Sequence, residues 1–320
     1  MNRRQFTLGA LFGGIAAYTA LSPKNAFAQY QDYSRSSSSI LPVESYIDPQ
    51  MASGSREPIG MTLVIGFDIS GSINSSTNEY TSQLLSIAES IERDDFREAI
   101  FAQGGPGSLA IFIVDYDHQS KLQIGGVDFR DNHPAKFRAF ADRVRRLERR
   151  NSNGSTDQSA ALENAAMCFE AAKRIWPCER NHVDIMTDGD GYATRNKVWI
   201  KKLAEEHGAS VSSMATRTSY NKDMREWCEE NLRTPSGLIG PNGRPVPAGV
   251  AVEVATEVQT QQSNISRYSN NVHHALRNHL NLQASYDGAP QSGNITRFAS
   301  TEQLEMPSRR RLFIPDSFDV

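Results

Sequence analysis

Residues 61–72 read MTLVIGFDISGS. Met61 to Phe67 form an almost continuous apolar run, which is typical of a strand covered on both faces. Such strands belong to parallel sheets that carry helices on either side. The run gives way at once to Asp68, Ser70 and Ser72. This stretch therefore predicts a buried strand with a polar turn at its carboxyl end.

Apolar patterns of strand and helix type alternate along the chain as far as residue 282. Further strands are predicted at 109–116, 121–129, 182–187, 209–215 and 250–254, and helices at 80–91, 134–148, 159–175, 197–207, 222–232 and 266–282. The strand at 121–129 is expected to be antiparallel at the sheet edge. The alternation predicts a Rossmann-like, doubly wound α/β fold, with a mostly parallel sheet and helices on both faces. Right-handed crossovers then gather the loops that follow the strands on one rim.

The first 28 residues have the features of a twin-arginine export signal. Arg3-Arg4 precede an apolar run, and Ala26-Phe27-Ala28 offers a cleavage site. A membrane anchor is the alternative, but glycines interrupt the run, which falls short of the roughly 20 apolar residues that span a bilayer. We expect cleavage after Ala28 and a periplasmic or secreted protein with no integral membrane segment in the mature chain.

The remaining chain divides by composition. Residues 29–58 are rich in Ser, Gln and Tyr and are expected to be a flexible linker. Residues 59–282 are expected to form the domain, and residues 283–320 a largely disordered tail. The formal net charge of -3 argues against nucleic acid or anionic membranes as the main partner.

The chain has three cysteines, Cys168, Cys178 and Cys228. An odd count in an oxidising compartment predicts one disulfide and one free thiol. Cys178 precedes a strand, and the helix that holds Cys228 is expected to descend toward the same end of the sheet. We therefore predict a Cys178–Cys228 disulfide, with Cys168 a buried thiol.

Two further segments bring oxygen ligands to the rim that holds Asp68. Thr156 precedes the Ala-rich helix, and Asp188 follows the strand at 182–187. The predicted metal ligands are two carboxylates and three hydroxyls, from Asp68, Ser70, Ser72, Thr156 and Asp188. Oxygen-only ligation suits a hard cation, Mg²⁺ first, with Mn²⁺ or Ca²⁺ as alternatives. A polar turn that only caps a helix is the competing interpretation of the Asp68 segment.

These five residues match, in order and type, the metal-ion-dependent adhesion site (MIDAS) of von Willebrand factor A (VWA) domains. Over roughly residues 61–282 the chain resembles exported bacterial VWA-like proteins of unknown function. It shares with them the stretches 94–100, 105–107 and 187–191, and a cysteine before the last. It departs from them at 238–243, where that group has a glycine-rich stretch ending in an aromatic. The departure leaves the local rim loop and the partner specificity open.

The resemblance implies a role for each residue of the site. Ser70, Ser72 and Thr156 would bind the metal through their hydroxyls, and the two aspartates directly or through water. One coordination position would stay open for an Asp or Glu of a protein partner. The implied function is an exported, divalent-cation-dependent protein-binding module of adhesion type. A metal-dependent hydrolase at the same rim, or a structural envelope component whose metal stabilises the fold, are the alternatives.

Other patterns in the sequence favour no second function. A Gly-x-Ser-x-Gly elbow, a phosphate-binding loop and a dinucleotide fingerprint are absent, so we expect no enzyme. Asp157 and Asp190 lie near the motif but are expected to be outer or solvated groups, with Asp190 available as a base if the protein were a hydrolase. His273, His274 and His279 do not share one helix face, so they are expected to be ordinary histidines rather than zinc ligands. The arginines of 143–150 are expected to form a solvated helix face.

Overall fold

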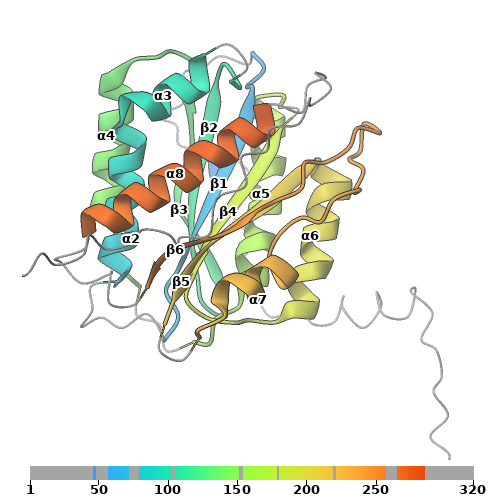
Figure 1. The fold of residues 1–320 in the computed structure, drawn as a ribbon. Helices are drawn as coiled ribbons and strands as arrows, with labels where there is room; N and C mark the ends of the chain where they lie inside the picture. Colours follow the sequence, from blue (N-terminus) through green and yellow to red (C-terminus); the bar gives the residue numbers. More distant parts are fainter. Residues whose placement is uncertain are drawn as a thin grey trace, which may run out of the picture.

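A six-stranded sheet lies at the centre of the molecule, in the order β3-β2-β1-β4-β5-β6 (Figure 1). The computed structural model describes residues 46–47, 57–71, 79–102, 105–150, 154–178, 180–218, 221–256 and 265–284. The strands are β1 (Met61–Asp68), β2 (Leu109–Tyr116), β3 (Ser120–Phe129), β4 (Asn181–Thr187), β5 (Ala209–Arg217) and β6 (Ala251–Thr256). Only β2 and β3 pair antiparallel, and the other neighbours in this sheet are parallel. The predicted mostly parallel α/β sheet, with an antiparallel strand at its edge, is confirmed.

The apolar runs form the strands that are covered on both faces. All residues of β1, β2 and β4 are buried. The first residues of β3 are partly exposed, as an edge strand permits. Continuous apolar sequence, rather than alternation, was thus the correct sign of the central strands.

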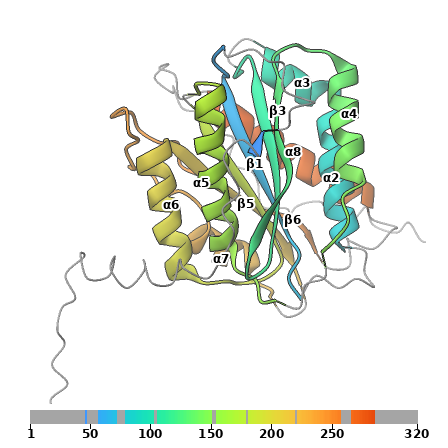
Figure 2. The same ribbon diagram turned by 180° about the vertical axis from the view of Figure 1, so that it is seen from behind.

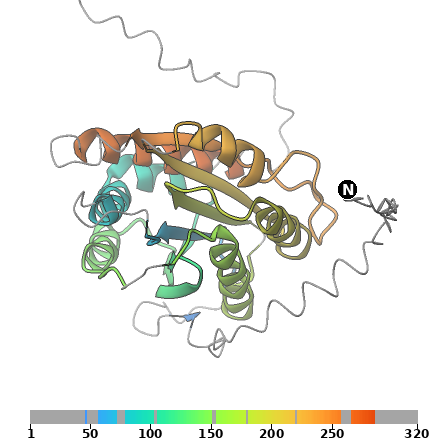
Figure 3. The same ribbon diagram turned by 90° about the horizontal axis from the view of Figure 1, so that it is seen from below.

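Helices cover both faces of the sheet. One layer contains α2 (Glu79–Glu92), α3 (Asp94–Phe101), α4 (Pro134–Arg145) and α8 (Ile265–Ala284). The other contains α5 (Gln158–Ile175), α6 (Ala193–His207) and α7 (Met224–Asn231). α8 runs obliquely across its face of the sheet (Figure 1), and α5 and α6 lie side by side on the opposite face (Figure 2). The view from below shows the strands between these layers (Figure 3).

Parts of the expected linker contact the domain. Tyr46 is only 5% exposed, and Ile47 forms a parallel bridge with Gly126 of β3. The Arg130 guanidinium donates to the carbonyl oxygens of Glu57 and Pro58. The rest of 29–58, the expected signal at 1–28 and residues 285–320 lie outside the described residues. The last helix continues to Ala284, two residues beyond the expected domain boundary at 282.

The predicted Cys178–Cys228 disulfide is not formed, since all three cysteines are free thiols in the structure. Cys178 bridges to Ile59, next to the start of β1, and its thiol donates to the carbonyl oxygen of Arg180. Cys228 instead faces Ser213 in β5, and burial raises the pKa of its thiol to about 12. Ser213 pairs with Ile185 of β4, seven residues beyond Cys178, so α7 leaves Cys228 at the middle of the sheet and does not carry it to Cys178 at the sheet's end. Cys168 is a buried thiol, as predicted.

Candidate metal centre

The carboxyl ends of β1 and β4 place two aspartates at the same edge of the sheet. Asp68 is the last residue of β1, and Asp188 comes directly after β4. The strands are parallel neighbours that pair Phe67 with Met186, so both aspartates leave the sheet at one rim. Thr156 reaches this rim from the segment before α5. Ser72 lies outside the described residues.

Backbone and side-chain hydrogen bonds fix the turn that follows β1. The Ser70 amide donates to Asp68 Oδ1 at 2.8 Å. The Ile69 amide donates to the carbonyl oxygen of Tyr116 at 2.8 Å, and the Gly71 amide to that of Gly154 at 3.0 Å. These bonds join the turn to β2 and to the Thr156 segment. The turn is therefore held by one bond of its own and from two neighbouring segments.

Arg149 contributes to the same turn, which corrects the prediction of a solvated arginine face. Its guanidinium donates to the carbonyl oxygens of Ile69 at 3.0 Å and Ser70 at 2.8 Å. The next residue, Arg150, donates from Nε to both carboxylate oxygens of buried Asp115 at 2.9 Å. The prediction was wrong for these two residues because α4 ends at Arg145, and the chain beyond it turns inward.

The hydroxyls of Thr156 and Ser70 meet at the rim. Thr156 Oγ1 donates to Ser70 Oγ at 2.8 Å. A Cβ at Gly189 would lie 2.7 Å from Thr156 Oγ1, a distance that real Cβ atoms do not show. Glycine at this position therefore lets the Asp188 loop approach the Thr156 hydroxyl.

Gln158 and Thr187, which sequence reasoning did not select, connect the loop to Asp68. Gln158 Nε2 donates to the carbonyl oxygen of Gly189 at 2.7 Å and to Thr187 Oγ1 at 3.1 Å. Thr187 Oγ1 in turn donates to Asp68 Oδ2 at 3.1 Å. The only sequence signal for these residues was their position next to Thr156 and Asp188. Thr187 thus orients Oδ2 of Asp68, while the Ser70 amide orients Oδ1.

The two aspartates are a buried pair of like charge. Asp68 is 0% exposed and Asp188 is 2% exposed. Desolvation, followed by the charge of Asp188, raises the pKa of Asp68 to about 7, although Ser70 and Thr187 donate hydrogen bonds to it. A cation beside such a pair favours the ionised form of both groups. The donor set of carboxylates and hydroxyls thus fits a hard divalent cation in charge and in chemistry.

The neighbouring aspartates, Asp157 and Asp190, each have hydrogen-bond partners outside the predicted ligand set. Asp157 is the N-cap of α5, where Oδ1 accepts from the Ser159 amide at 3.1 Å. Its Oδ2 accepts from Arg195 at 3.1 Å. Asp190 is exposed, and its carboxylate accepts from Asn221 at 3.3 Å.

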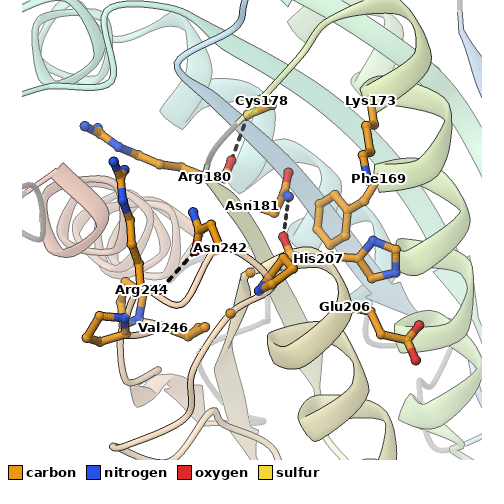
Figure 4. Close-up of a pocket in the computed structure, with 15 residues that line it drawn as sticks. Phe169, Lys173, Cys178, Arg180, Asn181, Glu206, His207, Asn242, Arg244 and Val246 are labelled. Atoms are coloured by element: carbon orange, nitrogen blue, oxygen red, sulfur yellow. Dashed lines mark hydrogen bonds between the residues drawn. The ribbon is translucent and has the colours of Figure 1, made fainter.

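A pocket of about 390 Å³ lies at the opposite end of the sheet (Figure 4). Its wall includes Asn181 at the start of β4 and His207 at the end of α6. Gly240, Pro241 and Asn242 also line it. The stretch 238–243 was expected to form a loop at the metal rim, and the structure places it at the far end instead. The departure from VWA-like proteins in this stretch therefore does not alter the candidate metal centre.

Among the helices that the structure describes, none combines the length and apolar character needed to cross a bilayer.

A mostly parallel sheet with helices on both faces defines a VWA-like domain, and the cluster of hydroxyls and carboxylates at its carboxyl rim is a candidate metal site. The chain belongs to the family described as "Protein of unknown function (DUF1194)", whose model matches residues 58–237. The match includes β1, β4 and the whole described candidate site. Helix α8 lies beyond it.

Solved structures with a similar fold are distant from this chain. Proximal thread matrix protein 1 from the mussel byssus, with a zinc-occupied MIDAS motif, is 14% identical with a TM-score of 0.42, covering 71% of this chain and 47% of that one. A von Willebrand factor type A protein from Catenulispora acidiphila is 14% identical with a TM-score of 0.36, covering 67% and 43%. BatB from Bacteroides thetaiotaomicron is 13% identical with a TM-score of 0.39, covering 70% and 99%. The chain spans about half the length of the mussel protein. No curated protein matches it.

Proposed function

We propose that this domain is an exported protein-binding module of adhesion type, which depends on a divalent cation. Asp68, Ser70, Ser72, Thr156 and Asp188 would hold the ion. The observation that supports the proposal most strongly is the buried pair of Asp68 and Asp188. Beside it lie the hydroxyls of Thr156 and Ser70, whose oxygen atoms are 2.8 Å apart. Export is proposed from the Arg3-Arg4 pair and the cleavage site at Ala28.

The chain's own residues prepare the site for an acidic partner. Asp68 is oriented through both oxygens, by the Ser70 amide and the Thr187 hydroxyl, so little freedom remains to be lost on binding. Arg149 donates to the carbonyl oxygens of Ile69 and Ser70 and so helps to order the turn. Bound there, Mg²⁺ supplies an open coordination position that a partner's Asp or Glu carboxylate can take.

Binding is favoured over hydrolysis by the surroundings of Asp190. A metal-dependent hydrolase needs a general base that can reach a metal-bound water. Asp190 was the sequence candidate for that base, and its carboxylate is exposed and hydrogen-bonded to Asn221. We therefore propose that the domain is not an enzyme.

Capture from an envelope extract tests the proposal. The full chain is immobilised and incubated with extract in Mg²⁺ or in chelator, together with the Asp68→Ala variant. We expect a partner that is retained only by the wild type in Mg²⁺ and is released by a soluble carboxylate in excess. Asp190→Asn is the matched control and should retain the same partner. Capture that is equal in chelator, or Mg²⁺-dependent turnover of phosphate or ester substrates, contradicts the proposal.

Export is tested by changing Arg3 and Arg4 to Lys, which should leave uncleaved precursor in the cytoplasm. N-terminal sequencing of the exported wild type should begin at Gln29. Exported material that still begins at Met1 or Asn2 would show that the signal is not removed.

A further inference from the structure

The first half of β4 carries a polar pair in an apolar layer. His182 and Asp184 are two residues apart, so their side chains share the face of β4 that α8 covers. Their register partners on β1 are Leu63 and Ile65. A histidine and an aspartate at the centre of a core require polar partners to be tolerated there.

His279 of α8 completes a cluster with this pair. Its Nδ1 lies 2.5 Å from Asp184 Oδ1, and His182 Nε2 lies 3.2 Å from the same oxygen. One ligand atom from each of the three side chains lies within 4.8 Å of the others. Asp184 is 0% exposed, and each histidine is 1% exposed. Two imidazole nitrogens and a carboxylate thus converge in a place closed to solvent.

The bonds around the cluster resemble those around a bound metal. His182 Nδ1 is 2.6 Å from Ser210 Oγ, an outer contact of the kind that orients a metal-binding imidazole. Within the part of the chain that the structure describes, buried Asp184 Oδ2 has no hydrogen-bond partner. The carboxylate therefore has an oxygen left over for a further ligand.

We propose that His182, Asp184 and His279 form a second metal site, for a borderline divalent transition ion such as Zn²⁺. Nitrogen ligands favour zinc and related ions over Mg²⁺, which prefers oxygen. The ion takes the place of the hydrogen bonds between the imidazoles and Asp184, so each histidine binds through that nitrogen as a neutral donor and keeps its proton on the other ring nitrogen. Asp184 and Asp188 are four residues apart along the strand, about 13 Å, so this site is separate from the rim.

The site would attach α8 to the central sheet. His182 and Asp184 belong to the segment that the family model matches, and His279 lies beyond it. Closing the contact through a metal links residues that are 95 positions apart in the chain. The rival arrangement is a metal-free network in which both imidazoles donate to Asp184, and the experiment below separates the two.

Zinc content of the full chain tests the proposal. The protein is dialysed against Zn²⁺ in excess Mg²⁺ and its metal content is measured, with Asp68→Ala included because zinc also binds at rims of this type. We expect Asp68→Ala to retain one equivalent of zinc, and Asp68→Ala/His279→Gln to lose it. His274→Gln is the matched control on the same helix, since His274 is exposed, and should lose nothing. No zinc in Asp68→Ala, or zinc unchanged by His279→Gln, overturns the proposal.

Two further measurements keep the test decisive if His279→Gln does not fold. X-ray absorption of zinc-loaded Asp68→Ala should show two imidazoles around the ion, and a spectrum without imidazole contradicts the site. Ser210→Ala in the Asp68→Ala background preserves all three ligands and should weaken zinc binding about 10-fold. Because these readouts do not involve the rim, the second site can fail while the proposed function stands, and the reverse also holds.

Discussion

Asp68 and Asp184 are both fully buried in the same sheet, yet their surroundings shift their pKa values in opposite directions. Desolvation and the charge of Asp188 raise the pKa of Asp68 to about 7. At Asp184 desolvation acts in the same sense, but the charges of His279 and His182 hold the pKa well below its usual range. Burial alone therefore does not decide the charge of a carboxylate. The nearest ionisable neighbours do.

The same contrast separates the metals that the two sites suit. The rim offers carboxylates and hydroxyls, which are oxygen ligands for a hard cation. The buried cluster offers two imidazoles and one carboxylate, which suit zinc-like ions. Both candidate sites thus take residues from β4 or its end: His182 and Asp184 lie within the strand, and Asp188 directly follows it.

Loss of Asp68 should have the largest effect, and it should be confined to the rim. Asp68→Ala removes one of two carboxylates and the acceptor that holds the Ser70 amide. We expect Mg²⁺ affinity to fall at least about 100-fold, because loss of a residue that only supports a ligand already costs up to about that much. Asp188→Ala should weaken binding less severely. Titration calorimetry checks both against Asp190→Asn, and unchanged Mg²⁺ affinity in a folded Asp68→Ala protein would remove the adhesion-site interpretation.

Neutralising Asp184 should be costly for folding. Asp184→Asn leaves His182 and His279 buried without their anionic partner, and removal of one member of a buried charged pair typically costs about 3 kcal/mol. Urea unfolding of metal-free protein measures the difference. The control is Asp142→Asn, because that carboxylate is exposed and pairs only with Arg145 in the described structure. Equal stabilities of Asp184→Asn and wild type would show that the cluster contributes little.

In the absence of a cation, neutralising Asp68 should stabilise the fold, whereas neutralising Asp184 destabilises it. At pH 8 in chelator, Asp68→Asn removes the repulsion with Asp188 and should stabilise the fold by about 1 kcal/mol, since one unit of pKa corresponds to about 1.4 kcal/mol. Added Mg²⁺ should reverse the order, because only the wild type gains from binding it. Thermal unfolding of both proteins with and without Mg²⁺ measures these differences. If Asp68→Asn were less stable than wild type in chelator, the hydrogen bonds of the Asp68 carboxylate would outweigh its repulsion with Asp188.

Arg149 should affect the rim without touching the ion. Arg149→Ala frees the carbonyl groups of Ile69 and Ser70, so the turn is less well ordered. We expect Mg²⁺ affinity to fall about 10-fold, as for other residues that position ligands. Arg146→Ala is the matched control, because Arg146 is exposed near the same helix end. If Arg149→Ala and Arg146→Ala bound Mg²⁺ equally well, Arg149 would have no part in ordering the turn.

A second aspartate–histidine contact, between His273 of α8 and Asp95, should contribute stability that is lost in acid. His273 Nε2 lies 2.9 Å from Asp95 Oδ2, and although burial raises the pKa of Asp95, hydrogen bonds from His273 and Arg93 lower it overall to about 2. A folded-state pKa below the unfolded value gives stability that is present above about pH 4 and is lost as pH falls toward 2. Asp95→Asn should flatten this part of the acid-unfolding curve, whereas Asp94→Asn, at an 83% exposed side chain, should not.

The sequence allowed the sheet and most of the rim to be predicted for one physical reason. Continuous apolar runs mark strands buried on both faces, and parallel strands bring the residues that follow them to one edge, as for Asp68 and Asp188. Helix α3 was missed because only Phe96 and Ile100 of its eight residues are buried, which is too few to give a helical period.

Contacts that depend on the packing of distant segments could not be predicted. Gln158 reaches the rim because it is the first residue of α5, and Arg149 because the chain turns inward after α4 ends at Arg145. The spacing of the histidines within α8 gives no information on their partners elsewhere in the chain. Asp184, which contacts His279, lies on β4, 95 residues earlier. The sequence did contain one indication of a buried polar cluster, because His182 and Asp184 share one face of a largely apolar strand.

The bridge between Ile47 and Gly126 has a consequence for self-association. The free edge of a sheet is a template on which a strand of another molecule can pair, and natural proteins cover or distort such edges to stay monodisperse. β3 is one edge of this sheet, and the chain's own Ile47 occupies a position along it. A second molecule that adds to β3 at Gly126 must first displace Ile47, so this bridge opposes edge-to-edge association.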